Sequence, residues 1–358
     1  MNFKDRNTLF PIAKQSLFDL YEMQLKAVWT PYEIDFTKDI KDLKNFSKEE
    51  RHLILQVLAF FAQSDSIVNE NLAIRFMKDV NIPEALQFYS FQIGIEAIHA
   101  HTYAKMIDTY IADTEEKNKL FNATRNFPMI AKKAAWMKKW IDSQDSFAKR
   151  LLAFAVVEGV FFSGSFCTIY WLKDKGKMPG LSMANDLISR DEGIHWVFAA
   201  ALYKELVKMD GSIKSKNFFI NSRVGDETVS DQKIGELMRE IHYTKKSMIN
   251  EEFKSLKFED VKALIQEAVA IEKEFITESV PVQLLGINSN LMGQYIEYIA
   301  DLVTSEFGFE KIYNAKQPFD FMIKNDVRGK VNFFEHTPTE YLKAVREEVS
   351  FDQINEDF

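Results

Sequence analysis

The chain has 358 residues, of which 46% are hydrophobic, and it carries a formal net charge of −8. Its length and its 31 phenylalanines are sufficient for a large buried core, and its negative charge, with no basic cluster, argues against nucleic acid as a partner. Only 13 glycines and 8 prolines are present, about half the average share. Few turn-forming residues, and no linker-like stretch in the middle of the chain, favour one large helical domain.

The cysteine count and the start of the chain bear on its compartment. Cys167 is the single cysteine, so no disulfide can form within the chain, and this suits a reducing environment. The first ten residues, MNFKDRNTLF, contain no apolar signal core. We therefore expect a cytoplasmic protein.

The predicted elements begin with an arm, residues 1–45, that contains a first helix ending before Pro31. Ser47 and Glu50 form a capping box that opens a long helix, and Pro83 suits the first turn of the next helix. Apolar periodicity predicts the helices that follow. The predicted helices cover residues 18–28, 47–80, 84–110, 114–121, 128–141, 147–173 and 181–209.

The patterns weaken after these helices. Residues 211–231 are polar and are predicted to form a connection. Amphipathic helices over 232–253, 258–286 and 291–306 are expected to pack outside the four long helices. We expect residues 46–335 to form the helical domain and the polar, acidic residues 336–358 to form a flexible tail.

The stretch 151–172 is long and apolar enough to cross a bilayer, since it contains one charged residue. That residue is Glu158, whose insertion would cost about 3 kcal/mol, and Ser163, Gly164 and Ser165 follow it. A helix that is apolar all round is also typical of a deep core. We expect a core helix and no membrane.

A polar stripe lies on the predicted helix 84–110. Glu96, His99 and Tyr103 stand at positions i, i+3 and i+7, which share one helical face. A carboxylate and an imidazole one turn apart can both reach the same ion, so that Glu-x-x-His is a two-point metal clamp.

The same motif recurs as Glu192-Gly-Ile-His195. A single carboxylate in an apolar run precedes each copy at a similar distance. Asp65 lies 31 residues before Glu96, and Glu158 lies 34 residues before Glu192. One acid from each of two helices, with Glu-x-x-His from each of two others, is the pattern of a four-helix dimetal carboxylate site.

Charge supports this interpretation. Four carboxylates and two neutral imidazoles carry −4, which two divalent cations would cancel, whereas bare buried carboxylates cost several kcal/mol each. One Glu-x-x-His alone is weak, because a solvated helix face carries it often. Two copies with matched acids make the site specific.

At these residues the sequence resembles the small, radical-generating subunit of class I ribonucleotide reductases. The resemblance extends from Trp29 to Phe358 and rests on several stretches: VLAFFAQSDSIVNENL, FQIGIEAIHAHTY, VEGVFFSGSF, ISRDEGIH and the terminal NEDF. It implies an all-α, ferritin-like bundle with flanking helices. The ligands that it implies are Asp65, Glu96 and His99 for one ion and Glu158, Glu192 and His195 for the other.

The resemblance also assigns the family's radical tyrosine to Tyr103, which helical spacing already places on the metal-facing stripe. The apolar residues that shield the radical fall on Phe162, Phe166 and Ile188. Phe162 and Phe166 share the helical face of Glu158 and offer no polar hydrogens to a radical.

A route for the oxidising equivalent is implied through Trp29, Asp191 and Tyr341. Asp191 has a physical reason of its own, because a ligating histidine usually donates its second N–H to a carboxylate. We expect Asp191 to take that place beside His99.

The resemblance implies that the C-terminal tail docks on a large catalytic subunit. Phe351, Ile354 and Phe358 have the i, i+3, i+7 spacing of helix anchors in a groove. The resemblance also implies a homodimer.

The expected cofactor is two metal ions, as Fe/Fe, Mn/Mn or Mn/Fe, because carboxylates and imidazoles suit both metals. Two other functions stay open on the residues alone: a stand-alone ferritin-like dimetal oxidase or metal-storage protein, and a structural bundle of ion-paired acids.

Overall fold

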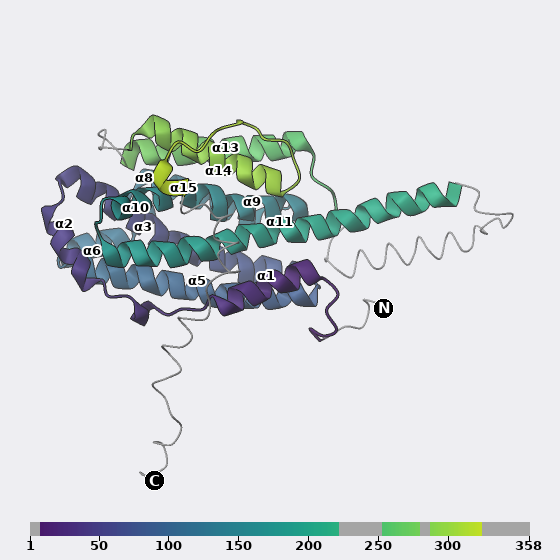
Figure 1. Ribbon diagram of the computed structural model, residues 1–358, viewed down its shortest axis with the longest axis horizontal. Coiled ribbons are helices and arrows are strands. Elements are labelled where there is room, and N and C mark those ends of the chain that lie inside the picture. Colours follow the sequence, from purple (N-terminus) through teal and green to yellow (C-terminus); the bar gives the residue numbers. More distant parts are fainter. Residues whose placement is uncertain (1–7, 222–252, 280–286, 324–358) are drawn as a thin grey trace, which may run out of the picture.

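The structure is a computed structural model that describes residues 8–221, 253–279 and 287–323; Figure 1 shows its arrangement. The described residues are all-α and contain no strand. The helices are α1 (Gln15–Lys26), α2 (Ile40–Asn45), α3 (Lys48–Asn71), α4 (Met77–Asp79), α5 (Pro83–Tyr110), α6 (Thr114–Phe121), α7 (Ala123–Asn126), α8 (Pro128–Asp142), α9 (Phe147–Val156), α10 (Phe162–Asp174), α11 (Pro179–Asn221), α13 (Phe258–Ser279), α14 (Ser289–Glu306) and α15 (Asp320–Ile323).

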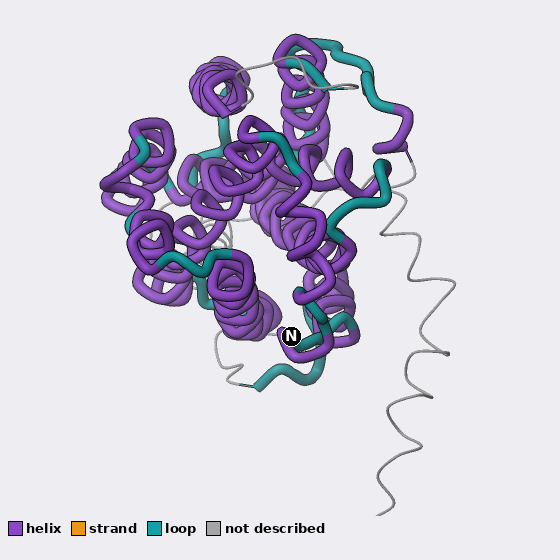
Figure 2. The backbone as a smooth tube through the Cα atoms, turned by 90° about the vertical axis from the view of Figure 1, so that its left-hand side faces the viewer, coloured by secondary structure: helices purple, strands orange, loops and turns teal. Residues whose placement is uncertain are grey.

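Four long helical segments form the core bundle: α3, α5, the α9–α10 segment and α11. Helix α3 packs on α5, α9 and α10 pack on α11, and the end-on view in Figure 2 shows the helices side by side. Helix α1 lies along α5 and α11, and α13 and α14 form a layer on another side of the bundle (Figure 1). The expected all-α bundle with flanking helices is confirmed.

Local sequence signals set several helix starts as predicted. The Ser47 side chain accepts a hydrogen bond from the Glu50 N–H (3.1 Å), and Glu50 accepts one from the Ser47 N–H (2.8 Å). This capping box satisfies donors that would otherwise be unpaired at the start of α3. Pro83 stands in the first turn of α5, where its missing N–H costs nothing.

The two helices that carry the lone acids contain a feature that the sequence did not predict. A wide turn of π-helix, η4 (Leu72–Phe76), follows α3, and a second, η5 (Val157–Phe161), joins α9 to α10. Apolar periodicity predicts a helix over both stretches but does not distinguish an α turn from a π turn. The second π turn contains Glu158.

Helix α11 is longer than predicted. It continues to Asn221, whereas residues from 211 onward were expected to form a polar connection. Polar composition separates solvated from buried positions rather than helix from loop, and 211–221 contain one glycine and no proline to end the helix. In Figure 1 this end of α11 extends beyond the bundle.

The apolar segment Phe147–Asp174 is the one helix in the described ranges that is long and apolar enough to cross a membrane. Its most apolar window is completely buried inside the protein. The segment packs against α8, α11, α13 and α14, as the centre of a bundle does. It is a core helix, as expected.

Candidate metal centre

The six predicted ligands meet in the middle of the bundle. Helix α5 supplies Glu96 and His99, and α11 supplies Glu192 and His195. Asp65 comes from α3 and Glu158 from the π turn η5. None of the six residues is more than 1% exposed.

Their ligand atoms form two overlapping groups. One group is Asp65, Glu96 and His99, and the other is Glu96, Glu158, Glu192 and His195; within each group, one ligand atom per residue lies within 4.8 Å of the others. Glu96 belongs to both groups. Two ions that share a carboxylate fit this overlap.

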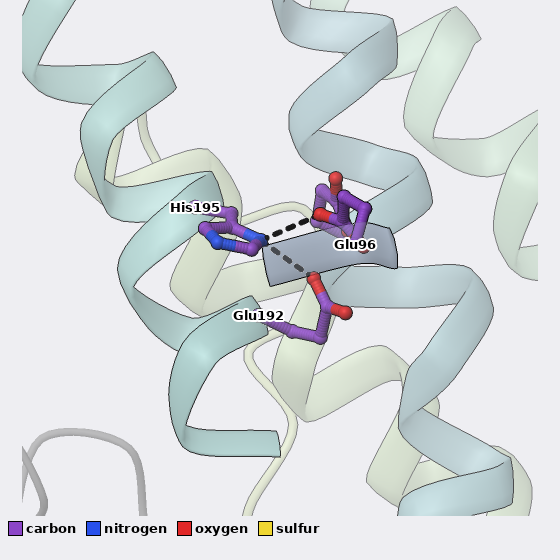
Figure 3. Close-up of side chains that lie close together, drawn as sticks. Glu96, Glu192 and His195 are labelled. Carbon is purple, nitrogen blue, oxygen red and sulfur yellow. Dashed lines mark hydrogen bonds and ion pairs between the residues drawn. The ribbon is translucent and has the colours of Figure 1, made fainter. Parts of the chain in front are cut away.

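Both motif glutamates lie between the two imidazoles. His195 Nδ1 is 2.9 Å from an oxygen of Glu96 and 2.9 Å from one of Glu192, as the dashed lines in Figure 3 mark. His99 Nδ1 is 2.9 Å from the second carboxylate oxygen of Glu192 and 3.3 Å from the second carboxylate oxygen of Glu96. Each of these two glutamates therefore offers one oxygen to each imidazole. We call the part of the cluster with Asp65 and His99 the His99 side and the part with Glu158 and His195 the Glu158 side, since Asp65 and Glu158 each belong to one group only.

The electrostatics of the cluster call for positive charge. Burial and then the charge of neighbouring carboxylates raise the pKa of Asp65 and of Glu158 well above their usual values. Burial lowers the pKa of His195, but the carboxylates of Glu96 and Glu192 outweigh it and raise that pKa to about 9. Four acids around two imidazoles therefore retain unbalanced negative charge, which divalent ions would neutralise.

The unpaired atoms of the cluster fit such ions. Both oxygens of Asp65, and one oxygen each of Glu96, Glu158 and Glu192, are buried with no hydrogen-bond partner among the described residues. His99 Nδ1 faces these carboxylates, and its nearest carboxylate oxygen belongs to Glu192 at 2.9 Å. Buried polar atoms normally have partners, so a convergent set without them indicates a ligand. Carboxylate oxygen and imidazole nitrogen are donors that suit iron and manganese.

A hydrogen-bonded chain leads outward from the His99 side. Trp29 Nε1 donates to Asp191 Oδ2 (2.8 Å), and His99 Nε2 lies 3.2 Å from the same oxygen. The Trp29 and His99 rings are also stacked, with centroids 6.0 Å apart. Although burial opposes ionisation, Arg190 and His99 hold the pKa of Asp191 below its usual value.

Arg190 is a member of this network that the sequence analysis missed. Its guanidinium donates to Asp191 Oδ1 from two nitrogens, at 3.0 and 2.9 Å, and to the carbonyl of Ala27 at 2.6 Å. It therefore ties Asp191 to the end of the arm that carries Trp29. Its position directly before Asp191 in ISRDEGIH was the available signal.

Tyr103 lies in the core next to the cluster, 2% exposed. Burial, and then the charges of Asp65, Glu192 and Glu96, raise the pKa of its phenol well above the usual value. The ring stacks on Phe61, with centroids 4.7 Å apart and planes within 9°.

The predicted shield residues lie one ring further out. Phe162 and Phe166 contact Phe61 at centroid distances of 5.6 and 5.0 Å, and Ile188 is buried in the same core. Phe61 itself was not predicted. Its spacing of four residues before Asp65, on the same face of α3, would have identified it.

Gln92 is a further residue that the sequence analysis missed. Its side-chain N–H groups donate to Glu96 (3.2 Å) and to Glu158 (3.3 Å), and it is fully buried. It stands one turn before Glu96 on α5, so the polar stripe could have been extended to it. Gln92 therefore connects Glu158, which belongs to one group, with Glu96, which belongs to both.

A small cavity reaches the Glu158 side of the cluster. It holds about 40 Å³ and lies between α10, α11, α14 and α15. Its lining includes Glu158 and Glu192 together with the hydroxyl residues Ser163 and Ser189. This volume suits one or two molecules of the size of water.

A bundle of four helices that brings two Glu-x-x-His motifs and two further acids together in its core defines a ferritin-like protein whose buried cluster is compatible with a dinuclear metal site. The family model for the small chain of ribonucleotide reductase matches residues 6–222 and 208–318. The chain belongs to the ribonucleotide reductase small-chain family, and it is thus one subunit of an oxidoreductase.

The relatives cover nearly the whole chain. The small chain of ribonucleoside-diphosphate reductase from Trypanosoma brucei brucei is 44% identical over 95% of this chain and 88% of its own. The small subunit from Dictyostelium discoideum is 45% identical over the same shares. The Rnr4 homodimer of the Saccharomyces cerevisiae ribonucleotide reductase matches in structure with a TM-score of 0.68, at 30% identity over 92% of this chain and 90% of that one.

Family membership implies a large subunit as partner, and none of these matches favours the stand-alone oxidase or storage protein. Tyr341 and the tail anchors Phe351, Ile354 and Phe358 lie outside the described residues.

Proposed function

We propose that this chain holds two metal ions, iron or manganese, with Asp65, Glu96, His99, Glu158, Glu192 and His195, and uses them to oxidise Tyr103. The observation that carries the proposal is the convergence of these six fully buried groups, which bring more carboxylate oxygens together than the two imidazoles can pair. When bound and oxidised by an external oxidant, the ions would supply the one-electron oxidising power that a phenol requires.

Tyr103 supplies the electron and the proton. Its raised pKa keeps the phenol protonated at rest, so its oxidation to a neutral radical releases one electron to the metal centre and one proton. Asp65 contributes the strongest of the carboxylate charges on the phenol and has two unpaired oxygens. This carboxylate is the proposed acceptor of the proton.

The aromatic core protects the oxidised ring. Phe61 covers one face of Tyr103, and Phe162 and Phe166 close the space behind Phe61. Water and polar hydrogens are excluded there, which is what a long-lived radical needs. Ile188 is buried in the same hydrophobic core and is proposed to contribute to this shield.

The His99–Asp191–Trp29 chain is the proposed exit for the oxidising equivalent. Its hydrogen bonds give a continuous path between the cluster and the arm. Tyr341 and the tail are proposed to continue this path and to dock on the large subunit, where ribonucleotides are reduced to deoxyribonucleotides. The chain is further proposed to be cytoplasmic and to form a homodimer, as the Rnr4 protein does.

Metal analysis combined with electron paramagnetic resonance tests the proposal. Protein loaded with iron(II) or manganese(II) and exposed to oxidant should contain two ions per chain and give a tyrosyl radical signal. Tyr103→Phe should keep both ions and lose that signal. A chain that binds no ions, or a Tyr103→Phe variant with the unchanged radical signal, would refute it.

A further inference from the structure

Lys133 is a charged residue buried in the apolar core behind the metal cluster. It stands on α8 and has no exposed surface, and it is the only lysine that is buried among the side chains the structure describes. Burial lowers its pKa to about 8 despite a neighbouring carboxylate, so the ammonium form prevails at neutral pH. No part of the proposed radical chemistry uses this residue.

The ammonium group has three kinds of neighbour. Nζ donates to the carbonyl oxygen of Phe161 at 2.7 Å and lies 2.6 Å from a carboxylate oxygen of Glu272 on α13. It also lies over the rings of Phe60 and Phe275, 3.3 and 4.2 Å from their centroids. These contacts fix the ammonium at one point between α3, α8, α13 and the turn η5.

Phe161 is the last residue of the π turn η5. Two carbonyls at the end of this turn accept hydrogen bonds from side chains. The preceding carbonyl, of Val160, accepts from Ser163 Oγ at 2.7 Å, and the Phe161 carbonyl accepts from Lys133. A π turn departs from the regular spacing of helical hydrogen bonds and is held only where its surroundings support it. Side-chain donors at its end are such support.

Helix α8 contacts Phe161 through two side chains. Lys133 binds the backbone of Phe161, and Trp136, one turn further along α8, packs on its ring with centroids 4.9 Å apart. Glu158 precedes Phe161 by three residues in the same turn, so a shift of this turn moves its carboxylate.

Stability alone does not account for the ion pair. Two charges in a dry core contribute little net free energy, and well-packed apolar residues of the same size do as well or better. What Lys133 provides, and an apolar residue does not, is a directional donor for the Phe161 carbonyl. The close approach of α10 to α13 supports the arrangement, since a Cβ on Gly164 would lie 2.7 Å from Glu272 Oε1.

We propose that Lys133 is a positioning residue that holds the π turn through the Phe161 carbonyl and thereby places Glu158 in the group that it forms with Glu96, Glu192 and His195. The proposal rests on the proposed dimetal function. In this proposal Lys133 supports only the Glu158 side of the cluster, and ion binding at the Asp65–His99 side does not depend on Lys133.

Titration of the metal-free protein with manganese(II) tests this inference, with the electron paramagnetic resonance signal of unbound manganese(II) measured at each addition. The unmodified chain should bind two ions. Lys133→Met should weaken one of the two sites by about 10–100-fold, the usual effect of losing a group that orients a ligand. Its charge effect alone would have the opposite sign, because removal of a nearby cation favours binding of another.

Two further variants separate the donor from the ion pair. Glu272→Gln leaves a lysine that still donates to Phe161, so this variant should lose far less affinity than Lys133→Met, because only a nearby negative charge is removed. Lys139→Met is the matched control, because Lys139 also stands on α8 and pairs with a glutamate of α13, Glu267, at 3.2 Å, but is exposed. It should have no effect.

A double variant covers the case in which Lys133→Met leaves Glu272 unpaired and fails to fold. Lys133→Met with Glu272→Leu replaces the pair by apolar residues and is expected to fold and to show the same weakened site. In a Glu158→Ala background the Lys133 substitution should add no further loss. A folded double variant that binds both ions as tightly as the unmodified chain would overturn the inference, whereas an unmodified chain that binds no ions would refute the dimetal function itself.

Discussion

The two sides of the cluster use the same residue types but are held in different ways. On one side, Asp65 stands on a regular turn of α3 and His99 is fixed from outside by Asp191, which also binds Trp29. On the other side, Glu158 stands on a π turn, and His195 Nε2 has no hydrogen-bond partner among the described residues. The sequence repeat is symmetrical, but its surroundings are not.

This difference separates two tasks. The His99 side is connected through side chains to the arm and is suited to conducting an oxidising equivalent. The Glu158 side is held through the backbone by Lys133 and borders the small cavity, so that it is suited to admitting a small oxidant.

The largest expected effect distinguishes the shared glutamates from the acids that serve one side. Glu96→Ala removes a carboxylate that faces both imidazoles, so both ions should be lost. Glu158→Ala should leave one ion per chain, held on the Asp65 and His99 side. Elemental analysis of the purified variants measures this, and equal metal content in the two variants would contradict the division into sides.

Metal removal should destabilise the protein through both sides. Each ion that binds only the folded chain adds about 2.7 kcal/mol when free ion is present at about 100 times its Kd. Chelation should therefore lower the thermal midpoint of unfolding, and in Glu158→Ala about half of this difference should remain. A midpoint that does not respond to chelation would show that the acids are neutralised in another way.

Substitution of Asp191 should affect the His99 side alone. Asp191→Asn keeps the shape of the side chain but removes the charge that orients His99, which typically costs about 10–100-fold in metal affinity. Only one of the two manganese(II) sites should weaken, and Lys133→Met should weaken the other. If both substitutions weaken the same site, the two supports do not act on separate sides.

The sequence predicted which six residues the structure brings together and the helices that carry them, because Glu-x-x-His spacing and lone acids in apolar runs are local patterns. It predicted Trp29 through resemblance, and Asp191 both through resemblance and as the carboxylate that a ligating histidine usually needs. It missed Arg190 and Gln92 although both lie beside predicted residues, because their contacts with Ala27 and Glu158 depend on how distant segments meet. Lys133 looks like an ordinary surface lysine in AKKAAW, since no local pattern shows that a third helix will cover it.

The π turns were also beyond the sequence. The stretches LLAFAVVEGVFF and NENLAIRFMKD have helical composition, and the one-residue shift in their hydrogen bonding is set by tertiary packing. The end of α11 was missed for a different reason, because polar residues were taken as a sign of a loop.

The smallest expected effects come from substitution of two glycines, Gly159 in the π turn η5 and Gly94 in the regular helix α5. A Cβ on Gly159, next to Glu158, would lie 2.8 Å from Val303 Cγ2, so Gly159→Ala should destabilise the fold by about 1–3 kcal/mol. Gly94 on α5 has open space, and Gly94→Ala should stabilise the fold by up to about 1 kcal/mol. Urea unfolding of the metal-free proteins measures both, and a stable Gly159→Ala variant would indicate that the π turn has room to move.

Anomalous diffraction from crystals grown with manganese(II) tests the central claim most directly. We expect two ion peaks in the bundle, one beside Asp65 and His99 and the other beside Glu158 and His195, with Glu96 and Glu192 between them. A single peak, or none within reach of these six residues, would contradict the account.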